Sequence, residues 1–166
     1  MNIIVTGGLG FIGSALIRYL ISKTKNNVLN LDAVTKVSMP EAVKPYDRSK
    51  RYKFIKINIA NKKRLTKIIN KYQPNLIFHL AAESHVDNSI NYPSKFIRTN
   101  ILGTFNILES SRLYLQANEH LFNKFKLIHV STDEVFGSLK LKEKSFNEMS
   151  QYRPSSPYSA SKASSD

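Results

Sequence analysis

The fold of this chain is decided by one stretch near its amino terminus, Thr6-Gly7-Gly8-Leu9-Gly10-Phe11-Ile12-Gly13. The stretch holds four of the six glycines and satisfies the pattern G-x-G-x-x-G, with glycines also at positions 7, 10 and 13. A turn this tight needs positive φ, and it lets a phosphate approach bare backbone while the next helix packs close to its strand. Free N–H groups and the helix dipole then face the anion. The stretch therefore predicts a turn that holds the pyrophosphate of a dinucleotide.

An acidic residue follows at the end of the next predicted strand. Asp32 can accept hydrogen bonds there from a ribose diol. The same carboxylate repels a 2′-phosphate, which favours NAD over NADP. The alternative is a glycine turn that binds nothing, beside a solvated aspartate. A glycine pattern alone is weak evidence, but this one lies between a predicted strand and a predicted helix.

Short apolar segments alternate with longer segments of helical period. This alternation is typical of βαβ units around a parallel sheet. We predict an α/β fold with a doubly wound, Rossmann-like parallel sheet, which binds ligands beyond the carboxyl ends of its strands. The predicted strands cover residues 2–6, 28–31, 52–57, 76–80 and 125–131. The predicted helices cover residues 9–22 and 62–72, a long segment after Pro93, and a last segment from Tyr158.

Helical spacing predicts which side chains of these helices face inward. In the first helix they are Ile12, Ala15, Leu16, Tyr19 and Leu20. In the second helix they are Leu65, Ile68 and Ile69. In the segment after Pro93 they are Phe96, Ile97, Ile101, Phe105, Leu108 and Leu113.

Composition limits the class of protein. A chain of 166 residues fits one domain, and without cysteine it forms neither a disulfide nor a cysteine-based metal site. We find no signal-peptide pattern and no apolar run near the roughly 20 residues that span a bilayer, so we expect a cytoplasmic protein without a membrane partner. The formal charge of +13 would suit an anionic partner. Because the basic residues are scattered and do not interleave with aromatic residues, we do not expect nucleic acid to be that partner.

Tyr158 and Lys162 are four residues apart at the start of a predicted helix, so their side chains share a face. A phenol with its ordinary pKa of about 10 is a poor base at neutral pH. A nearby ammonium, together with an oxidised nicotinamide, stabilises the phenolate and lowers this pKa. The pattern Tyr-x-x-x-Lys occurs often by chance, but here it follows the glycine turn and a predicted strand that ends in Ser131-Thr132.

This arrangement resembles the short-chain dehydrogenase/reductase superfamily, in the extended branch that acts on sugar nucleotides. Four segments are similar to the dTDP-glucose 4,6-dehydratase family of that branch: HLAAESHVD (79–87), TNILGT (99–104), STDEVFG (131–137) and PSSPYSASK (154–162). The similarity covers nearly the whole chain and is weakest over residues 33–53.

The resemblance implies an NAD-dependent lyase whose partner is a nucleotide-sugar substrate, dTDP-glucose. It implies that Tyr158, helped by Lys162, takes the C4 hydroxyl proton as hydride passes to NAD, while Thr132 holds the sugar near its C4 oxygen. Asp133 would then act as the acid on the C6 hydroxyl and Glu134 as the base at C5, before hydride returns at C6 to give dTDP-4-keto-6-deoxyglucose. Epimerases of the same fold need no such acid–base pair. Taken alone, the two acids would be an ordinary polar exit from a strand.

The resemblance also implies which residues line the ligands. Ser84 and Thr132 would contact the substrate. The implied cofactor-binding residues are Gly7, Gly10, Phe11, Ile12, Gly13, Asp32, Asn58, Ile59, Leu80, Ala81, Ala82, Glu83, Ser84, Thr99, Tyr158 and Lys162. We predict no metal site, because the strand-end residues His79 and His85 have no carboxylate at ligand spacing. Members of the family form homodimers.

The chain departs from the family pattern in sequence and in extent. Asn58 stands where Asp is usual, Phe136 where Tyr is usual and Asn88 where Arg is usual. Members of the family continue into further strands and a substrate domain, so we expect residues 1–166 to form one NAD-binding Rossmann domain, incomplete at its carboxyl end, without a second domain. Three alternatives stay open: a catalytically inactive NAD-binding remnant, another extended short-chain epimerase or dehydratase, and a basic nucleic-acid-binding module.

Overall fold

The computed structural model of the chain describes residues 1–141 and 143–166. These residues form two compact units. The first unit comprises Met1–Ala81 and Gly103–Val130, and the second comprises Ala82–Leu102 and Ser131–Asp166. Each unit is described by itself.

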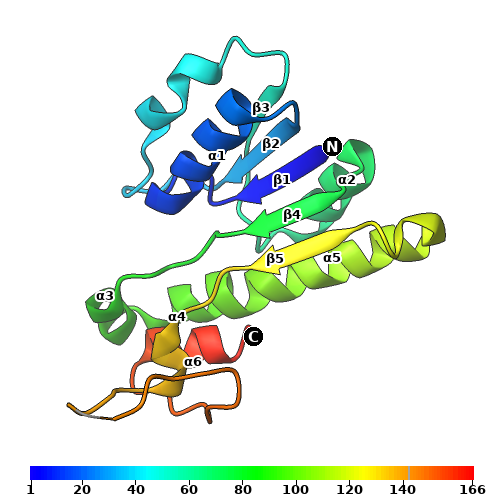
Figure 1. Ribbon diagram of the computed structural model, residues 1–166. Coiled ribbons are helices and arrows are strands. Elements are labelled where there is room, and N and C mark those ends of the chain that lie inside the picture. Colours follow the sequence, from blue (N-terminus) through cyan, green and yellow to red (C-terminus); the bar gives the residue numbers. More distant parts are fainter. Residues whose placement is uncertain (142) are drawn as a thin grey trace. The chain divides into compact units, whose positions relative to one another are not determined.

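The first unit is built on a five-stranded parallel sheet (Figure 1). Its strands are β1 (Asn2–Thr6), β2 (Asn27–Asp32), β3 (Tyr52–Lys56), β4 (Leu76–His79) and β5 (Lys126–His129). They lie in the order β3-β2-β1-β4-β5. The order reverses between β1 and β4, which is the point where doubly wound sheets bind ligands beyond the strand ends. The prediction of a Rossmann-like parallel sheet is confirmed.

Helices cover both faces of this sheet. Ile17 and Leu20 of α1 (Phe11–Lys23) pack in one apolar cluster with Ile3, Val5 and Val28. The helices α2 (Lys62–Tyr72) and α5 (Thr104–Gln116) contribute to the second apolar cluster, which includes Leu65, Ile69, Ile107 and Tyr114 with Ile4, Leu29, Leu31 and Ile77. Short 3-10 helices lie at Pro40–Ala42, Lys44–Tyr46 and Glu119–Leu121, the first two within residues 33–53, where the family resemblance is weakest.

The predicted inward face of α1 is wrong for three of its five residues. Ile12 and Tyr19 are each 60% exposed and Ala15 is exposed, whereas Leu20 is buried. The buried residues of this helix are Gly13, Ser14, Ile17, Leu20 and Ile21. The cause is Gly13, because a Cβ there would overlap the carbonyl oxygen of Gly7. This close approach turns the Gly13 side of the helix inward, and the apolar positions that follow it at helical spacing are buried with it.

The segment after Pro93 is not one regular helix. It forms α4 (Pro93–Phe96), a π-helical stretch (Ile97–Gly103) and then α5. A π-helical stretch changes the helical repeat, so a face predicted from regular spacing fails beyond it. Phe96 is buried as predicted, but Ile97, Phe105 and Leu108 are about half exposed. The buried face of α5 consists instead of Thr104, Asn106, Ile107, Ser110, Ser111 and Tyr114.

The second unit contains α3 (Val86–Asn91), α4, a 3-10 helix (Asp133–Phe136) and α6 (Pro157–Ala163). α6 packs against the other three. Its start is fixed by Pro157 in the first turn and by a capping box between Ser156 and Ser159. Among the residues described, no helix is long and apolar enough to cross a membrane.

Candidate functional site

The glycine turn lies in the first unit, between β1 and α1. Gly7 has φ +70°, and a Cβ there would lie 2.7 Å from both the Cα and the nitrogen of Ala81. The Gly7 N–H donates to the Leu31 carbonyl at 2.8 Å, and the Gly10 N–H donates to the Gly7 carbonyl at 3.0 Å. Gly7 is thus required both by its left-handed conformation and by the closeness of the β4 exit. The turn brings the ends of β1, β2 and β4 together, as a dinucleotide-binding turn requires.

The start of α1 faces open space. Gly10 is its N-cap and has no side chain with which to bond the first N–H groups of the helix. Phe11 is 82% exposed and Ile12 is more than half exposed. Backbone donors beside exposed apolar side chains can hold a phosphate and cover part of an organic ligand. The predicted cofactor-binding residues Phe11 and Ile12 are accordingly accessible.

Asp32 is buried and ties the glycine turn to the loop after β2. Its Oδ2 accepts from the Leu9 N–H at 3.0 Å. Its Oδ1 accepts from the Val34 N–H at 2.8 Å and from the Ser38 hydroxyl at 3.2 Å. A carboxylate has about four acceptor positions, so these bonds leave little capacity for a ribose diol. Asp32 therefore also shapes the turn, a contribution that the sequence did not reveal.

The other predicted cofactor residues of the first unit differ in what they offer. Asn58 is exposed, and its Oδ1 accepts from the Ala60 N–H at 2.9 Å. The side chain of Ile59 packs in the apolar core, so this residue can contribute only through its main chain. Leu80 and Ala81 follow β4 and are half-buried, with the Leu80 N–H bonded to the Thr6 carbonyl at 3.2 Å.

The second unit brings the predicted catalytic residues together. Thr132 caps the 3-10 helix that carries Asp133 and Glu134, and its Oγ1 accepts from the Glu134 N–H at 3.3 Å. The Tyr158 hydroxyl on α6 is hydrogen-bonded to the Thr132 side chain. The charges of Asp133 and Glu134 act on the same hydroxyl. A phenol and a hydroxyl are thus paired, with two exposed carboxylates near enough to act on them electrostatically, which is an arrangement suited to moving protons.

Burial raises the pKa of the Tyr158 phenol above its ordinary value of 10, and the negative charges of Glu134, Asp133 and Asp166 act in the same direction. The hydrogen bond with Thr132 opposes this shift. The shift is opposite to the one expected from the Tyr–Lys spacing. The reason is that the polypeptide surrounds the phenol with apolar atoms and carboxylates. A positive charge supplied by an oxidised nicotinamide would offset it.

Lys162 is only 3% exposed. Burial lowers the pKa of its ammonium, while the charge of Asp166 raises it. A buried lysine of this kind keeps its charge only where negative groups face it. The charge of Lys162 therefore depends on its carboxylate neighbour Asp166. Its place on the helix is set by its position one turn after Tyr158.

Residues 82–99, which include further predicted ligand-binding residues, belong to the same unit. Ala82 and Ser84 are exposed, while Glu83 and Thr99 are half-buried. The main chain of Glu83 is held by a residue that we did not predict as functional. Asn100, 1% exposed in the π-helical stretch, accepts from the Glu83 N–H and donates to the Glu83 carbonyl, both at 2.9 Å.

Asn100 also reaches the catalytic helix. Its Nδ2 donates to Ser161 Oγ at 2.9 Å, and that hydroxyl donates to the Tyr158 carbonyl at 2.7 Å. Asn100 therefore joins the Glu83 segment to α6. The signal that could have found it is its place in the segment TNILGT (99–104), which the family resemblance had already singled out.

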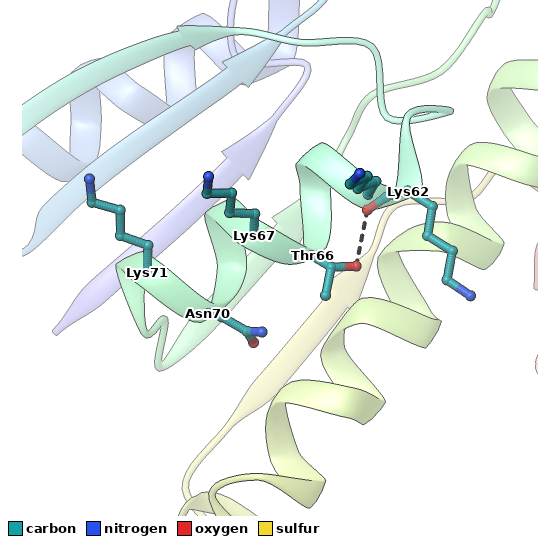
Figure 2. Close-up of a pocket in the computed structure, with 6 residues that line it drawn as sticks. Lys62, Thr66, Lys67, Asn70 and Lys71 are labelled. Carbon is teal, nitrogen blue, oxygen red and sulfur yellow. Dashed lines mark hydrogen bonds between the residues drawn. The ribbon is translucent and has the colours of Figure 1, made fainter.

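A hollow on the surface of α2 is a second place where a ligand could bind (Figure 2). Its six lining residues are Lys62, Lys63, Thr66, Lys67, Asn70 and Lys71. The Thr66 hydroxyl lies within 3.0 Å of the Lys62 carbonyl, to which it donates. Solvated ammonium groups of this kind attract anions in general, but these six side chains include no carboxylate that could act as an acid or a base. The catalytic candidates remain those of the second unit.

A metal site was not predicted. Over residues 1–141 and 143–166, no group of three or more histidine or acidic side chains is placed to hold a metal ion. His79 instead stacks on His129, with ring centroids 5.1 Å apart.

The parallel sheet in this strand order, the glycine turn after β1 and the Tyr–Lys pair on α6 define a Rossmann-like protein of the short-chain dehydrogenase/reductase type. A family model described as GDP-mannose 4,6 dehydratase matches residues 4–166. The chain belongs to the GDP-mannose 4,6-dehydratase family.

Individual relatives carry narrower names. The chain is 48% identical to the dTDP-glucose 4,6-dehydratase of Haemophilus influenzae, over 100% of this chain and 49% of that protein. It is 46% identical to the enzyme of the same name from Salmonella typhimurium, again over 100% of this chain and 48% of that protein. The chain thus spans about half the length of these curated relatives.

Solved structures agree with this similarity. The dTDP-glucose 4,6-dehydratase of Streptomyces venezuelae, with NAD and TYD bound, superimposes with a TM-score of 0.88 at 36% identity, covering 99% of this chain and 49% of that one. The UDP-Glc/GlcNAc 4-epimerase of Campylobacter jejuni gives 0.84 at 25% identity, over 99% of this chain and 46% of that one. Dehydratases and epimerases therefore share this fold.

Proposed function

We propose that the chain provides the NAD-binding and catalytic half of a sugar-nucleotide 4,6-dehydratase, a lyase that converts dTDP-glucose to dTDP-4-keto-6-deoxyglucose. The observation that carries the proposal is that Thr132 is hydrogen-bonded to the Tyr158 hydroxyl while the charges of the adjacent Asp133 and Glu134 act on it. An epimerase needs the tyrosine, but it has no water to eliminate and so no use for an adjacent acid and base. The names of the two relatives reported above support the same choice.

In this proposal the cofactor is NAD. The N–H groups at the start of α1 would hold its pyrophosphate, and Asp32 would repel the 2′-phosphate of NADP. The remaining contacts would come from the residues predicted above, among them Asn58, the Leu80–Ser84 segment and Thr99. NAD, when bound, would supply the redox chemistry, accepting a hydride from C4 of the sugar and returning it at C6, while C5 regains a proton from the protonated Glu134 or from solvent.

The polypeptide itself would move the protons. Tyr158 takes the proton of the C4 hydroxyl, while Thr132 holds the oxygen and Lys162 stabilises the phenolate. Glu134 then removes the proton at C5, and Asp133 gives its proton to the C6 hydroxyl, which leaves as water. Ser84 contacts the sugar in the same arrangement. Positioned acid–base groups of this kind typically contribute about 10²–10⁴-fold each to the rate.

The partners and location follow from the same proposal. We propose that the chain acts in the cytoplasm and forms a homodimer, without nucleic acid or membrane as a partner. We further propose that residues 1–166 serve as one NAD-binding domain. No metal takes part, because proton transfer by side chains and hydride transfer by NAD account for every step.

The test is turnover of dTDP-glucose by the purified chain, alone and mixed with the carboxyl-terminal half of the Haemophilus influenzae relative. Loss of one water from the sugar nucleotide, measured by mass spectrometry and abolished in Tyr158→Phe, supports the proposal. NAD binding, measured by calorimetry, separates the two parts of the claim. Binding without turnover in either preparation would indicate a protein that only binds NAD, and absence of both would overturn the proposal.

A further inference from the structure

A series of hydrogen-bonded, buried side chains connects the first turn of α5 to the end of β1. Thr6 Oγ1 lies 2.7 Å from His79 Nδ1, and His79 Nε2 lies 2.9 Å from Thr104 Oγ1. All three residues are at most 2% exposed. Buried polar chains of this kind favour one arrangement of the elements that they join, because any slip leaves a group unsatisfied.

These hydrogen bonds can be satisfied in either direction, because each tautomer of His79 pairs with both threonine hydroxyls. Thr6 Oγ1 also accepts from the Ala81 N–H at 3.2 Å. If the Thr6 hydroxyl donates to Nδ1, then the proton of His79 lies on Nε2 and is donated to Thr104, and Ala81, Thr6 and His79 each have a partner. This series of hydrogen bonds fixes the main chain of Ala81, which lies directly against Gly7.

A second buried side chain in the same turn of α5 reaches a different strand end. Asn106 Nδ2 donates to the Ile59 carbonyl at 3.0 Å, and Asn106 is 2% exposed. Ile59 follows Asn58, whose side chain bonds the Ala60 N–H. Two residues of one helical turn therefore hold the exits of both β3 and β4.

We infer that Thr104 and Asn106 are positioning residues for the dinucleotide site. Thr104 acts through His79 and Thr6 on the Ala81 main chain beside the glycine turn, and Asn106 acts on the Asn58–Ile59 segment. The inference rests on the proposed function, because both segments are those assigned to NAD. An apolar pair of similar size would fill the same space but would remove the bonds to His79 and to the Ile59 carbonyl, which leaves the two exits free to shift.

The variants that test this are Thr104→Val, which removes the hydroxyl at nearly constant volume, Thr104→Ser, which restores it, and Asn106→Leu. Thr66→Val is the matched control, because the Thr66 hydroxyl bonds Ser110 of the same helix at 2.7 Å but links α5 to α2. Two properties are measured on the full chain: amide hydrogen exchange without ligand, and the dissociation constant for NAD.

We expect Thr104→Val to speed exchange of the Ala81 amide and to weaken NAD binding, each by about tenfold, and Thr104→Ser to restore both. Asn106→Leu should speed exchange of the Ala60 amide and weaken binding similarly. The inference is overturned if Thr104→Val changes neither property, or if Thr66→Val changes both equally. If the unchanged chain binds no NAD, the proposed function fails, and the exchange measurements alone decide whether Thr104 positions Ala81.

Discussion

Asn100 and Glu83 form a two-way pair in which the asparagine side chain satisfies both main-chain polar groups of the glutamate, each at 2.9 Å. The pairing copies the pattern that one strand makes with another. The Glu83 segment lies in no sheet, yet its main chain at Glu83 is hydrogen-bonded as it would be beside a neighbouring strand. Because the same amide bonds Ser161, one side chain holds this segment and the helix of Tyr158 and Lys162 together.

Asn100→Asp should break this pair from one side only. The new carboxylate can still accept from the Glu83 N–H, but its second oxygen faces the Glu83 carbonyl and repels it. We expect a loss of about 2 kcal/mol in the free energy of unfolding of the second unit, measured by urea denaturation. Asn88→Asp, on the exposed surface of α3, makes the same change of charge and should cost little. Equal losses in the two variants would show that charge, not pairing, is responsible.

Gly7→Ala and Gly10→Ala separate folding from ligand binding. At Gly7 the added Cβ meets the Ala81 main chain at 2.7 Å with φ at +70°, so we expect a loss of about 1–3 kcal/mol in stability. At Gly10 the Cβ meets only the Gly7 carbonyl at 3.2 Å, so the protein should stay folded. Its methyl group would nevertheless stand where a phosphate approaches, and NAD affinity should fall. Calorimetric NAD binding and thermal unfolding of both variants check this; full NAD affinity in Gly10→Ala would contradict the assigned phosphate position.

The sequence was sufficient for features that depend on local pattern. The five strands, their parallel arrangement and the glycine turn follow from apolar runs, crossover lengths and the conformational freedom of glycine. The rotation of α1 did not follow, because it depends on a contact between Gly13 and Gly7 that hydrophobic spacing does not contain. The buried face of α5 was also predicted wrongly, because a π-helical stretch changes the helical repeat before that helix begins.

For the candidate site, too, some features could be predicted from the sequence and others could not. Thr132, Asp133, Glu134 and Tyr158 were found from motifs, and the structure brings them together in one unit. The direction of the shift in the pKa of Tyr158 could not be predicted from the spacing of Tyr158 and Lys162. It depends on burial and on carboxylates from other parts of the chain. Asn100 was overlooked because its partners, the Glu83 main chain and the Ser161 hydroxyl, lie far from it in the sequence.

The buried phenol of Tyr72 should make the free energy of unfolding fall at alkaline pH. Burial raises the pKa of its phenol from 10.0 to about 12. Since the folded pKa is the higher one, the stabilisation is complete below pH 10 and is lost as the pH rises toward 12. Tyr72→Phe should therefore flatten the fall in unfolding free energy across this window. Tyr19→Phe is the control, because Tyr19 is 60% exposed. An unchanged slope in Tyr72→Phe would show that other groups cause the fall.

Glu134→Gln and Asp133→Asn distinguish the acid from the base in the proposed elimination. In heavy water, a base at C5 exchanges the C5 proton with solvent, so the product carries deuterium at that carbon. Glu134→Gln should remove this exchange while oxidation at C4 persists, seen as reduced nicotinamide that accumulates during turnover. Asp133→Asn should keep the exchange but slow the loss of water, because the C6 hydroxyl then leaves without a proton donor. Each change should lower the overall rate by about 10²–10⁴-fold.

The matched control for this pair is Glu148→Gln, which neutralises an exposed carboxylate of the same unit and should leave the rate and the isotope pattern unchanged. Product analysis by mass spectrometry and nuclear magnetic resonance gives both readouts from one reaction. Persistent deuterium incorporation in Glu134→Gln together with its loss in Asp133→Asn would reverse the two assignments. Loss of exchange in both variants would mean that the two carboxylates act as a coupled pair, since each then needs the charge of the other to hold its proton.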